Sequence, residues 1–593
     1  MVKTHMQGAP AVAVDPSHTV VTRLWERAAS PGGEHILRYP ANGGWAELTW
    51  EQLGGRVRAV AAGLIAIGIA PGDRVAVMSA TRVEWTIADL AILSVGAATV
   101  PLYETNSKEQ CAWILSDSGA KAAIAETADH TGKVEAARGQ APELGEIFVI
   151  EEGGLDALAG RADAQHREQV SRRAAAVGQD DLATIVYTSG TTGNPKGCML
   201  THRNLLWTAR QCHHRLGRML SRGDSTLLFL PLAHIFARMI QLVCLDSDVT
   251  MGYARSIRTL GDDIASFRPT FLVAVPRVLE KVFNTAQRKA EGPKAKVFDF
   301  AVRTSKRRAE PAGKGLVTGL KHAVADKLVY AKVRAALGGR VRYCISGSAP
   351  LAPHLAAFFD AAGITVVEGY GLTETCGAAT VNAPEQTRLG TVGPPLPGVE
   401  IAIAADGEIL IRGGTVFAGY HHNEEATGQV LDADRWFHSG DIGELDDDGC
   451  LRITGRKKEL IITAAGKNVA PAVLEERLKE HRLVSAAMVV GDNRPFVGCL
   501  ITLEPEELAA FAAGQGLSGS VPDLCEADAV QAEVAKAVEH ANAAVSRAES
   551  IRRWKVLTRD FSLEDGELTP KLSVRRAVVA AHFAEEIESL YRT

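Results

Sequence analysis

Long apolar runs, internal repeats and low-complexity tracts are all absent from the sequence. A membrane-spanning helix needs about 18 consecutive apolar residues, so we expect a soluble protein without a transmembrane segment. The N-terminus also lacks the apolar core of a signal peptide. Basic residues are not in excess, because 65 lysines and arginines are balanced by 70 aspartates and glutamates, a net charge of −5. Nucleic-acid-binding proteins usually carry a strong basic excess, so a nucleic-acid partner is not expected.

Closely paired cysteines are missing as well. The nine cysteines are scattered and odd in number, which favours a reducing cytoplasm over a disulfide framework. No zinc-type spacing is present. The histidine pairs at 213–214 and 421–422 have no neighbouring cysteine or carboxylate cluster, and adjacent side chains on a helix diverge. We therefore do not expect a histidine-based metal site.

A chain of 593 residues is too long for a single hydrophobic core, so two or more domains are expected. Residues 18–120 alternate helical stretches with short apolar runs, residues 399–454 show short strands with turns, and residues 471–546 show helix, strands and helix. The pattern predicts an α/β fold, with a large N-terminal domain of layered α/β sheets, a β-rich subdomain and a small α+β C-terminal domain. The predicted segments are a disordered tail at 1–15, an N-terminal domain at 16–454, a hinge at 455–458 and a C-terminal domain at 459–593.

A loop rich in hydroxyls and glycine follows the apolar, β-branched run at 183–188, and Thr201 could cap a helix behind it. This order predicts a strand, a phosphate-binding loop and a helix. The common nucleotide P-loop does not fit, because Pro195 precedes Lys196 where that motif needs glycine. The loop offers the hydroxyls of Ser189, Thr191 and Thr192 and the backbone of Gly190, Gly193 and Gly197.

Four more apolar runs end in polar, glycine- or proline-bearing turns, at 231–234, 276–277, 346–350 and 368–374. In open α/β sheets the ligand crevice lies beyond the carboxyl ends of the strands, so we expect these turns to converge on one site. Glu374 at such a strand end is a candidate Mg²⁺ ligand, together with the hydroxyl of Thr191.

The segment from about 281 to 342 has a helical pattern and is rich in lysine and arginine. Two interpretations stay open: a solvated helical face, or a patch for an anionic membrane surface or for the phosphates of a ligand. Peripheral membrane contact is therefore left open by the sequence.

Residues 187–197 read Tyr-Thr-Ser-Gly-Thr-Thr-Gly-Asn-Pro-Lys-Gly. This string closely resembles the phosphate loop of the adenylate-forming acyl-CoA synthetases. Residues 71–79, 98–103 and 434–471 resemble the long-chain fatty acid:CoA ligases within that superfamily, and the resemblance extends over roughly residues 20–593. It implies that ATP, with Mg²⁺, activates a fatty acid to acyl-AMP, and that CoA then takes the acyl group. The C-terminal domain would turn about a hinge at Lys458 between these two half-reactions.

The resemblance also assigns roles to individual residues. It implies that Tyr370 lies against adenine, that Asp441 binds the ribose with Arg456, and that Glu374 binds magnesium. The implied ATP- and AMP-binding set is Thr188, Ser189, Gly190, Thr191, Thr192, Gly193, Lys196, Gly347, Ser348, Ala349, Gly369, Tyr370, Gly371, Thr373, Asp441 and Arg456. The implied CoA-side loop is Gly466, Lys467 and Asn468.

His234 matches a residue that gates the acyl pocket or orients the carboxylate in the family, although a buried structural histidine explains it nearly as well. The apolar stretch 235–245, with Phe229, Val366 and Ala378, is a candidate acyl tunnel. Core packing explains these apolar residues equally well.

The C-terminal tail departs from the family pattern. Residues 568–576 read Leu-Thr-Pro-Lys-Leu-Ser-Val-Arg-Arg, so Ser573 stands where the long-chain ligases have a lysine that reaches the acyl and phosphate oxygens. Lys571 lies two positions earlier and is our candidate for that charge. The alternative is a surface lysine with weak adenylation. The sequence also leaves open an adenylate-forming enzyme with a non-CoA acceptor, such as an amide-forming ligase or a nitrite-activating diazotase, and a catalytically impaired nucleotide-binding protein.

Overall fold

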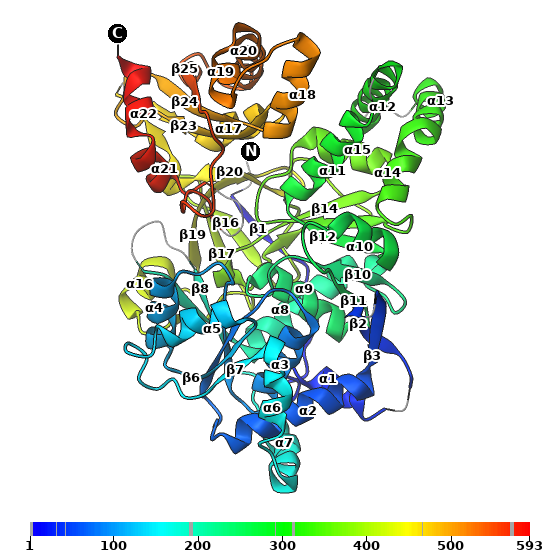
Figure 1. Cartoon of the computed structure of the whole chain (residues 1–593), viewed down its shortest axis with the longest axis vertical. Helices are drawn as coiled ribbons and strands as arrows, with labels where there is room; N and C mark the ends of the chain where they lie inside the picture. Colours follow the sequence, from blue (N-terminus) through cyan, green and yellow to red (C-terminus); the bar gives the residue numbers. More distant parts are fainter. Residues whose placement is uncertain are drawn as a thin grey trace. The chain divides into compact units, whose positions relative to one another are not determined.

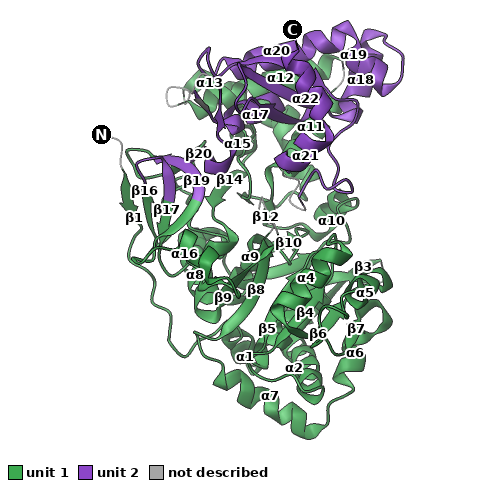
Figure 2. Ribbon diagram, turned by 90° about the vertical axis from the view of Figure 1, so that its left-hand side faces the viewer, with its two compact units in different colours: residues 1–402, 410–439, 445–451 green, residues 403–409, 440–444, 452–593 purple. Residues whose placement is uncertain are grey.

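The computed structural model describes residues 4–30, 32–41, 43–188, 194–290, 292–310, 315–464, 467–569 and 574–592. The chain forms two compact units (Figure 2). Unit 1 comprises residues 1–402, 410–439 and 445–451, and unit 2 comprises residues 403–409, 440–444 and 452–593. Both units combine helices with sheets, which confirms an α/β fold with a large N-terminal and a smaller C-terminal domain.

The largest sheet of unit 1 has the strand order β18-β9-β8-β5-β4-β6-β7, and Figure 2 labels its strands from β9 to β7. Its centre is parallel, and its strands are almost entirely apolar, as expected for strands that are covered on both faces. The strands are β4 Arg74–Met78, β5 Ala98–Leu102, β6 Ala120–Ala125, β7 Ile147–Val149, β8 Leu182–Thr188, β9 Lys196–Thr201 and β18 Gly419–Tyr420.

Helices cover this sheet. Cys111 and Leu115 of α4, with Val134 of α5, pack against Ala76 and Met78 of β4. Helix α2 packs against its neighbours α1, α3, α6 and α7. The helices are α1 Thr22–Ala28, α2 Trp50–Ala66, α3 Val83–Ser94, α4 Lys108–Ser118, α5 Ala128–Glu135, α6 Gly154–Ala159 and α7 Ala164–Ala176, with the 3₁₀ turn η1 Ile150–Glu152.

The segment after the hydroxyl-rich loop differs from the prediction. It forms β9, antiparallel to β8, before helix α8, His202–Leu216, begins. The predicted direct passage from loop to helix is therefore wrong. The apolar residues around Leu200 are buried as a strand beside β8, a tertiary preference that the local sequence does not show. The predicted cap is confirmed, because the Thr201 side chain accepts a hydrogen bond from the backbone N–H of Asn204 in a capping box.

Two four-stranded sheets follow in unit 1. Their orders are β12-β13-β14-β15 and β10-β11-β2-β3, and β12, β13 and β14 run parallel. The strands are β2 His35–Ala41, β3 Gly44–Thr49, β10 Ser225–Leu228, β11 Thr250–Tyr253, β12 Phe271–Ala274, β13 Tyr343–Ser346, β14 Thr365–Tyr370 and β15 Thr380–Val381. Their helices are α9 Ile235–Asp246, α10 Leu260–Phe267 and α15 Pro353–Ala361, with the 3₁₀ turns η2 Gly217–Met219 and η5 Thr373–Thr375.

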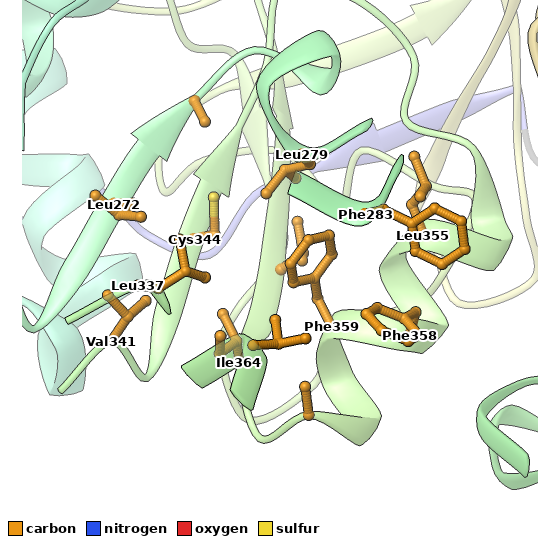
Figure 3. Packing of buried hydrophobic residues seen from close by; sticks show 14 of the residues in the cluster. Leu272, Leu279, Phe283, Leu337, Val341, Cys344, Leu355, Phe358, Phe359 and Ile364 are labelled. Carbon is orange, nitrogen blue, oxygen red and sulfur yellow. The ribbon is translucent and has the colours of Figure 1, made fainter. Parts of the chain in front are cut away.

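An aromatic-rich core fixes the helices next to these sheets. Figure 3 shows Phe283 close to Leu355 and Phe358, with Phe359 beneath Leu279. The rings of Phe283 and Phe358 meet edge to face, with centroids 4.9 Å apart. The remaining helices here are α11 Pro276–Arg288, α12 Pro293–Ala309, α13 Leu316–Ala325, the π-helical turn η4 Asp326–Tyr330 and α14 Ala331–Ala336. The helical prediction for this basic segment is therefore confirmed in its described residues.

A five-stranded sheet has the strand order β1-β16-β17-β19-β20. Its strands are β1 His5–Gln7, β16 Glu400–Ile403, β17 Glu408–Arg412, β19 Phe437–Leu445 and β20 Leu451–Arg456, and helix α16, Glu424–Val430, precedes β19. The predicted disordered tail at 1–15 is wrong for β1, which pairs antiparallel with β16. An open strand edge offers unpaired backbone groups, and β1 satisfies those of β16.

Unit 2 contains the sheet β23-β24-β25, in which β24 and β25 are parallel. The strands are β21 Ile461–Ile462, β22 Asn468–Val469, β23 Val484–Val490, β24 Val497–Leu503 and β25 Ile551–Val556. The helices are α17 Pro471–Lys479, α18 Pro505–Gln515, α19 Val521–Glu526, α20 Asp528–Asn542, α21 Arg576–His582 and α22 Ala584–Tyr591, with the 3₁₀ turn η6 Lys457–Glu459. In the described ranges, no helix combines the length and apolar character that crossing a bilayer requires.

Candidate active site

The turns after β12, β13 and β14 lie at one edge of their sheet, because these strands are parallel and paired in register. The start of α9 approaches the same edge. A Cβ placed on Gly347, just after β13, would lie 3.5 Å from the ring of Phe236 and 3.5 Å from the carbonyl oxygen of Gly369. Four of the predicted turns in unit 1 are therefore brought together around this edge, as expected for an α/β ligand site.

The turn after β14 needs glycine for a steric reason. A Cβ on Gly371 would lie 2.6 Å from the backbone nitrogen of Ala378, closer than any side chain could be tolerated. Gly369 is similarly crowded, with the carbonyl oxygen of Thr380 at 3.1 Å from such a Cβ. This tightly packed turn is followed directly by η5, in which Thr373 and Glu374 are buried. On the neighbouring turn Ser348 has a left-handed backbone, with φ of 71°, beside exposed Ala349.

Glu374 is the buried carboxylate at the centre of this arrangement, with 9% of its surface exposed. Its Oε1 accepts a 2.8 Å hydrogen bond from the hydroxyl of Tyr420, and its backbone oxygen accepts one of 2.8 Å from the N–H of Phe417. The ammonium group of Lys196 lies 5.1 Å from the centre of the Tyr420 ring, a cation–π contact. Lys196, Tyr420 and Glu374 thus form a connected set from three segments.

Sequence reasoning missed Tyr420. Burial and the charge of Glu374 raise the pKa of the Tyr420 phenol far above its ordinary value, so its hydroxyl remains a proton donor. Burial and Glu374 also raise the pKa of the Cys198 thiol, which excludes a thiolate there. Nothing in the local sequence marks Tyr420, since it meets Glu374 only through the pairing of β18 with β9.

The predicted phosphate loop is only partly visible, because Ser189, Gly190, Thr191, Thr192 and Gly193 lie outside the described residues. The two ends of the loop are held together, since Thr188 of β8 pairs with Lys196 of β9. The backbone oxygen of Pro195 also accepts a 2.9 Å hydrogen bond from the indole N–H of Trp113.

His234 caps α9, and its Nδ1 accepts a 3.1 Å hydrogen bond from the backbone N–H of Phe236. Helix α9 is anchored by the fully buried pair of Arg238 and Asp89, with a nitrogen–oxygen distance of 2.5 Å. Thr184 of β8 accepts a 2.6 Å hydrogen bond from the same guanidinium group. The position of His234 is therefore tied to the central sheet.

Glu368 is a second buried carboxyl that sequence reasoning missed. It lies within β14, is 6% exposed, and its Oε1 has no hydrogen-bond partner among the described residues. Burial raises the pKa of Glu368 to about 7, against a partly opposing hydrogen bond from the backbone of Leu351. The sequence gives no signal for this beyond the position of Glu368 before Gly369.

In unit 2, Asp441 of β19 and Arg456 at the end of β20 form an ion pair, with Arg456 Nε 2.7 Å from Asp441 Oδ1. Asp441 is 4% exposed. The sequence placed these two residues in one predicted ribose site, and the structure brings them into contact. Next to them, the ammonium group of Lys457 lies 2.6 Å from Asp406, and Lys458, the predicted hinge, is in η6.

The structure describes only part of the predicted CoA-side loop, and it does not describe the candidate adenylation lysine, Lys571. Lys467 forms an ion pair of 3.4 Å with Glu549, and the backbone of Asn468 pairs with Ile462 of β21. Gly466 lies outside the described residues, as do Lys571 and Ser573. Leu568 and Val574, which bracket the latter two, form an antiparallel bridge, so the ends of that segment are close together.

Several apolar candidates for an acyl tunnel are core residues. Phe229 and Val366 belong to the aromatic-rich cluster shown in part in Figure 3. Residues 235–245 of α9 are almost all buried, and Ala378 is 9% exposed. Packing accounts for their burial, and a role as tunnel lining stays a prediction.

The fit of a divalent cation can be judged at Glu374. Within the described ranges no lysine, arginine or histidine forms an ion pair with this buried carboxylate, and Tyr420 donates a hydrogen bond to it. A buried charge without a counter-charge is costly, so a cation at this position is favourable. Mg²⁺ is usually held by one or two carboxylates together with substrate phosphates and water, which matches a single carboxylate beside a phosphate loop. Elsewhere in the described chain no three histidine, cysteine or acidic residues gather as a ligand set, and His421 and His422 stack with ring centroids 3.8 Å apart.

Comparisons with known proteins agree along the length of the chain. A family model described as AMP-binding enzyme matches residues 24–421, and one described as AMP-binding enzyme C-terminal domain matches residues 458–593. The chain is 46% identical over 559 residues to the long-chain-fatty-acid--CoA ligase FadD15 of Mycobacterium bovis, covering 93% of each chain. It is 31% identical to the long-chain-fatty-acid--CoA ligase ACSBG2 of Xenopus laevis, covering 100% of this chain and 86% of that one.

Solved structures support the same fold. A fatty acyl CoA synthetase from Mycobacterium tuberculosis matches with a TM-score of 0.64 and 23% identity, covering 96% of this chain and 99% of that one. The anthranilate CoA ligase AuaEII, solved with anthranoyl-AMP, matches with a TM-score of 0.74 and 20% identity, covering 96% of this chain and 98% of that one. At these identities the likeness concerns the fold alone.

Proposed function

This chain belongs to the AMP-binding enzyme family, and from that membership we propose that it is a long-chain fatty acid:CoA ligase that forms AMP. The enzyme activates a fatty acid with ATP and joins the acyl group to CoA, releasing AMP and pyrophosphate. The observation that best supports this function is the near-full-length similarity to the mycobacterial ligase. The similarity covers both the adenylating part and the C-terminal part of the chain. The same similarity favours CoA over the other acceptors that the sequence left open.

In the first half-reaction, a fatty acid carboxylate oxygen attacks the α-phosphorus of ATP, and the bond from that phosphorus to the pyrophosphate oxygen breaks. Two anions must meet, so the site has to supply positive charge and hydrogen-bond donors. In unit 1 we assign the phosphates to the loop Ser189 to Gly193 and to Lys196. We assign the adenine to the turn of Gly347, Ser348 and Ala349 and to Tyr370.

The metal fits the donor set of unit 1, since Glu374 would hold Mg²⁺ together with the hydroxyl of Thr191. When bound, the ion neutralises phosphate charge as a Lewis acid. The protein's own contribution is to keep Glu374 buried and oriented, and the hydrogen bond from Tyr420 fixes one of its oxygens. In unit 2, Asp441 accepts hydrogen bonds from the ribose hydroxyls, and its contact with Arg456 holds the carboxylate in place.

In the second half-reaction, the CoA thiol attacks the acyl carbon, the bond to the phosphate oxygen breaks, and AMP leaves with both electrons of that bond. We assign contacts with CoA to Gly466, Lys467 and Asn468. Lys458 is the proposed hinge of unit 2. A reducing cytoplasm suits the chain, because all nine cysteines are buried and free.

The test is pyrophosphate release with palmitate, with other carboxylic acids and with nitrite, each with and without CoA. We expect palmitate to be adenylated and to become a thioester only when CoA is present. Release that depends on nitrite, or an activated acid that passes to an amine instead of CoA, would replace this function with one of the alternative acceptors. Absence of pyrophosphate release with every substrate would favour a nucleotide-binding protein without activity.

A further inference from the structure

Helix α13 carries an apolar row on its solvent side. Five of the nine exposed large hydrophobic side chains in the described part of the chain lie on α13 and η4. They are Leu316, Val317, Leu320, Val324 and Leu328, with exposed fractions of 91%, 66%, 72%, 51% and 43%. Monomeric soluble proteins rarely expose apolar groups in such a contiguous set, so the row marks an interaction surface.

The position of the row follows from the helix geometry. Thr318 and Ala325 are buried toward the core, and His322 between them bonds the backbone oxygen of Ala361 at 2.8 Å. Leu320 lies two residues after the inward-facing Thr318, Val324 lies two residues after His322, and two residues turn an α-helix by about 200°. The apolar row therefore lies opposite the core-facing side and cannot pack against the unit that carries it.

The helix is rigidly mounted on that core. Figure 1 shows α12 and α13 side by side, and the two helices are in contact. Tyr330 of η4, fully buried, donates a 2.8 Å hydrogen bond to the backbone oxygen of Ala301 in α12. The exposed apolar row is thus a fixed feature of the folded protein.

The helical segment that carries the row and its neighbour α12, which contacts α13, are rich in exposed basic residues. Lys321 and Lys327 are exposed on the same helical segment, and α12 exposes five further basic residues. These are Lys294, Lys296, Arg303, Lys306 and Arg307. The acidic residues of this segment are fewer: Asp299 and Glu310 are exposed, and Asp326 is paired with Arg334 at 2.6 Å.

We propose that α13 docks this protein onto the surface of an anionic lipid bilayer, with its apolar row inserted among the headgroups and the surrounding lysines and arginines on the lipid phosphates. Apolar side chains on one face with lysine and arginine beside them are the pattern of helices that lie in the membrane interface. Each basic side chain near an anionic surface adds to the attraction. A second copy of the chain fits less well, because it would bring a second set of the same positive charges against the first.

The docking surface is separate from the candidate active site, and its test needs neither ATP nor CoA. Full-length protein is floated with vesicles of phosphatidylcholine alone and with vesicles containing about equal parts of phosphatidylcholine and phosphatidylglycerol. We expect binding to the anionic vesicles only, weakened by high salt. The triple variant Leu316→Ser, Leu320→Ser and Val324→Ser should partition onto these vesicles at least about tenfold less, because buried apolar area drives the insertion of a helix into the membrane interface. Lys321→Glu with Lys327→Glu should lose several-fold.

A matched control removes three exposed apolar side chains elsewhere, by Ile257→Ser, Val521→Ser and Leu563→Ser, and should bind as the unaltered protein does. Thermal unfolding of all variants checks that they fold, and pyrophosphate release with a short, water-soluble acid should be unchanged. Equal vesicle binding by the α13 triple variant and the unaltered protein overturns the proposal. So does a dimer in sedimentation that the α13 triple variant converts to monomer without any vesicle binding.

Discussion

The hydroxyl of Tyr420 donates a 2.8 Å hydrogen bond to Oε1 of Glu374, although 46 positions separate the two residues in the sequence. The contact depends on β18 pairing with β9, which brings Tyr420 beside Cys198. One oxygen of the buried carboxylate is therefore fixed, and the carboxylate has no basic partner among the described side chains. This geometry makes the charge of Glu374 and the hydrogen bond from Tyr420 separable by mutation.

Removal of the Glu374 charge should stop adenylation. In Glu374→Gln the side chain keeps its shape and can still accept from Tyr420, but it no longer attracts a divalent cation. We expect pyrophosphate release to fall by at least about a hundredfold, as for other single electrostatic groups. Tyr420→Phe is the comparison, because it removes one hydrogen bond and leaves the charge. It should cost about tenfold or less. Near-normal release by Glu374→Gln would show that this carboxylate is not the metal ligand.

The buried pair of Arg238 and Asp89 should be essential for stability. Both side chains are fully buried, and Asp89→Asn would leave the guanidinium charge of Arg238 without compensation. We expect chemical denaturation to show a loss of about 3–5 kcal/mol in the free energy of unfolding. The control is Glu146→Gln at the exposed pair with Arg161, which should cost about 1 kcal/mol or less. The double variant Asp89→Leu with Arg238→Met should be less destabilised than Asp89→Asn. Equal losses at the buried and exposed pairs would contradict this account.

Glu368 should make stability depend on pH. Its pKa is raised by burial from 4.5 to about 7. Between these two values the folded protein holds a proton that the unfolded chain has lost, so the free energy of unfolding falls as pH rises. The contribution is complete below about pH 4.5, is lost by about pH 7, and amounts to roughly 3 kcal/mol.

Glu368→Gln removes this titration. The difference in unfolding free energy between the unaltered protein and Glu368→Gln should change across pH 4.5 to 7 and be level above that range. Urea denaturation at several pH values measures this difference. The effects of the other titrating groups cancel, because they are the same in both proteins. The same substitution at the exposed Glu151, Glu151→Gln, is the control for removing a carboxylate at the surface. A flat difference for Glu368→Gln would show that the buried carboxyl stays ionised.

The sequence predicted the features that depend on local pattern. Thr201 has a side chain that can cap a helix, the run before Ser189 has β-branched residues, and both predictions are confirmed. The turn at Gly371 was identified as part of a site, and close backbone approach explains why glycine is needed there. What the sequence could not show are contacts between distant segments. Tyr420 reaches Glu374 only through a sheet edge, β9 forms only because β8 lies beside it, and Glu368 is buried by the surrounding fold. Ligand roles at these positions stay predictions.

Lys458 should separate the two half-reactions. The family resemblance implies that the C-terminal domain turns about this residue, and proline fixes φ and removes an N–H. We expect Lys458→Pro to keep pyrophosphate release with palmitate and to lose thioester formation. Lys458→Ala, which keeps backbone freedom, should retain both. If Lys458→Pro lost both half-reactions together, misfolding or a hinge elsewhere would be the better explanation.

Lys571 should supply the positive charge that the family lysine provides, because Ser573 occupies that lysine's place. In an extended segment, side chains two positions apart point to the same side and are displaced by about 6.5–7 Å. A flexible lysine side chain can span part of that distance. Leu568 and Val574, on either side of Lys571 and Ser573 in the sequence, form an antiparallel bridge.

We expect Lys571→Ala to lower pyrophosphate release by about ten- to a thousandfold, as for a lost transition-state donor. Adding Ser573→Lys to that variant should restore activity, since it returns the charge to the family position. Lys536→Ala, at an exposed lysine paired with Glu533, is the charge-matched control and should have no effect. Restoration by Ser573→Lys would show that the charge must reach the reacting oxygens. A lysine that only stabilises the tail could not be replaced by a lysine two positions away. Unchanged release by Lys571→Ala would mean that adenylation uses another donor.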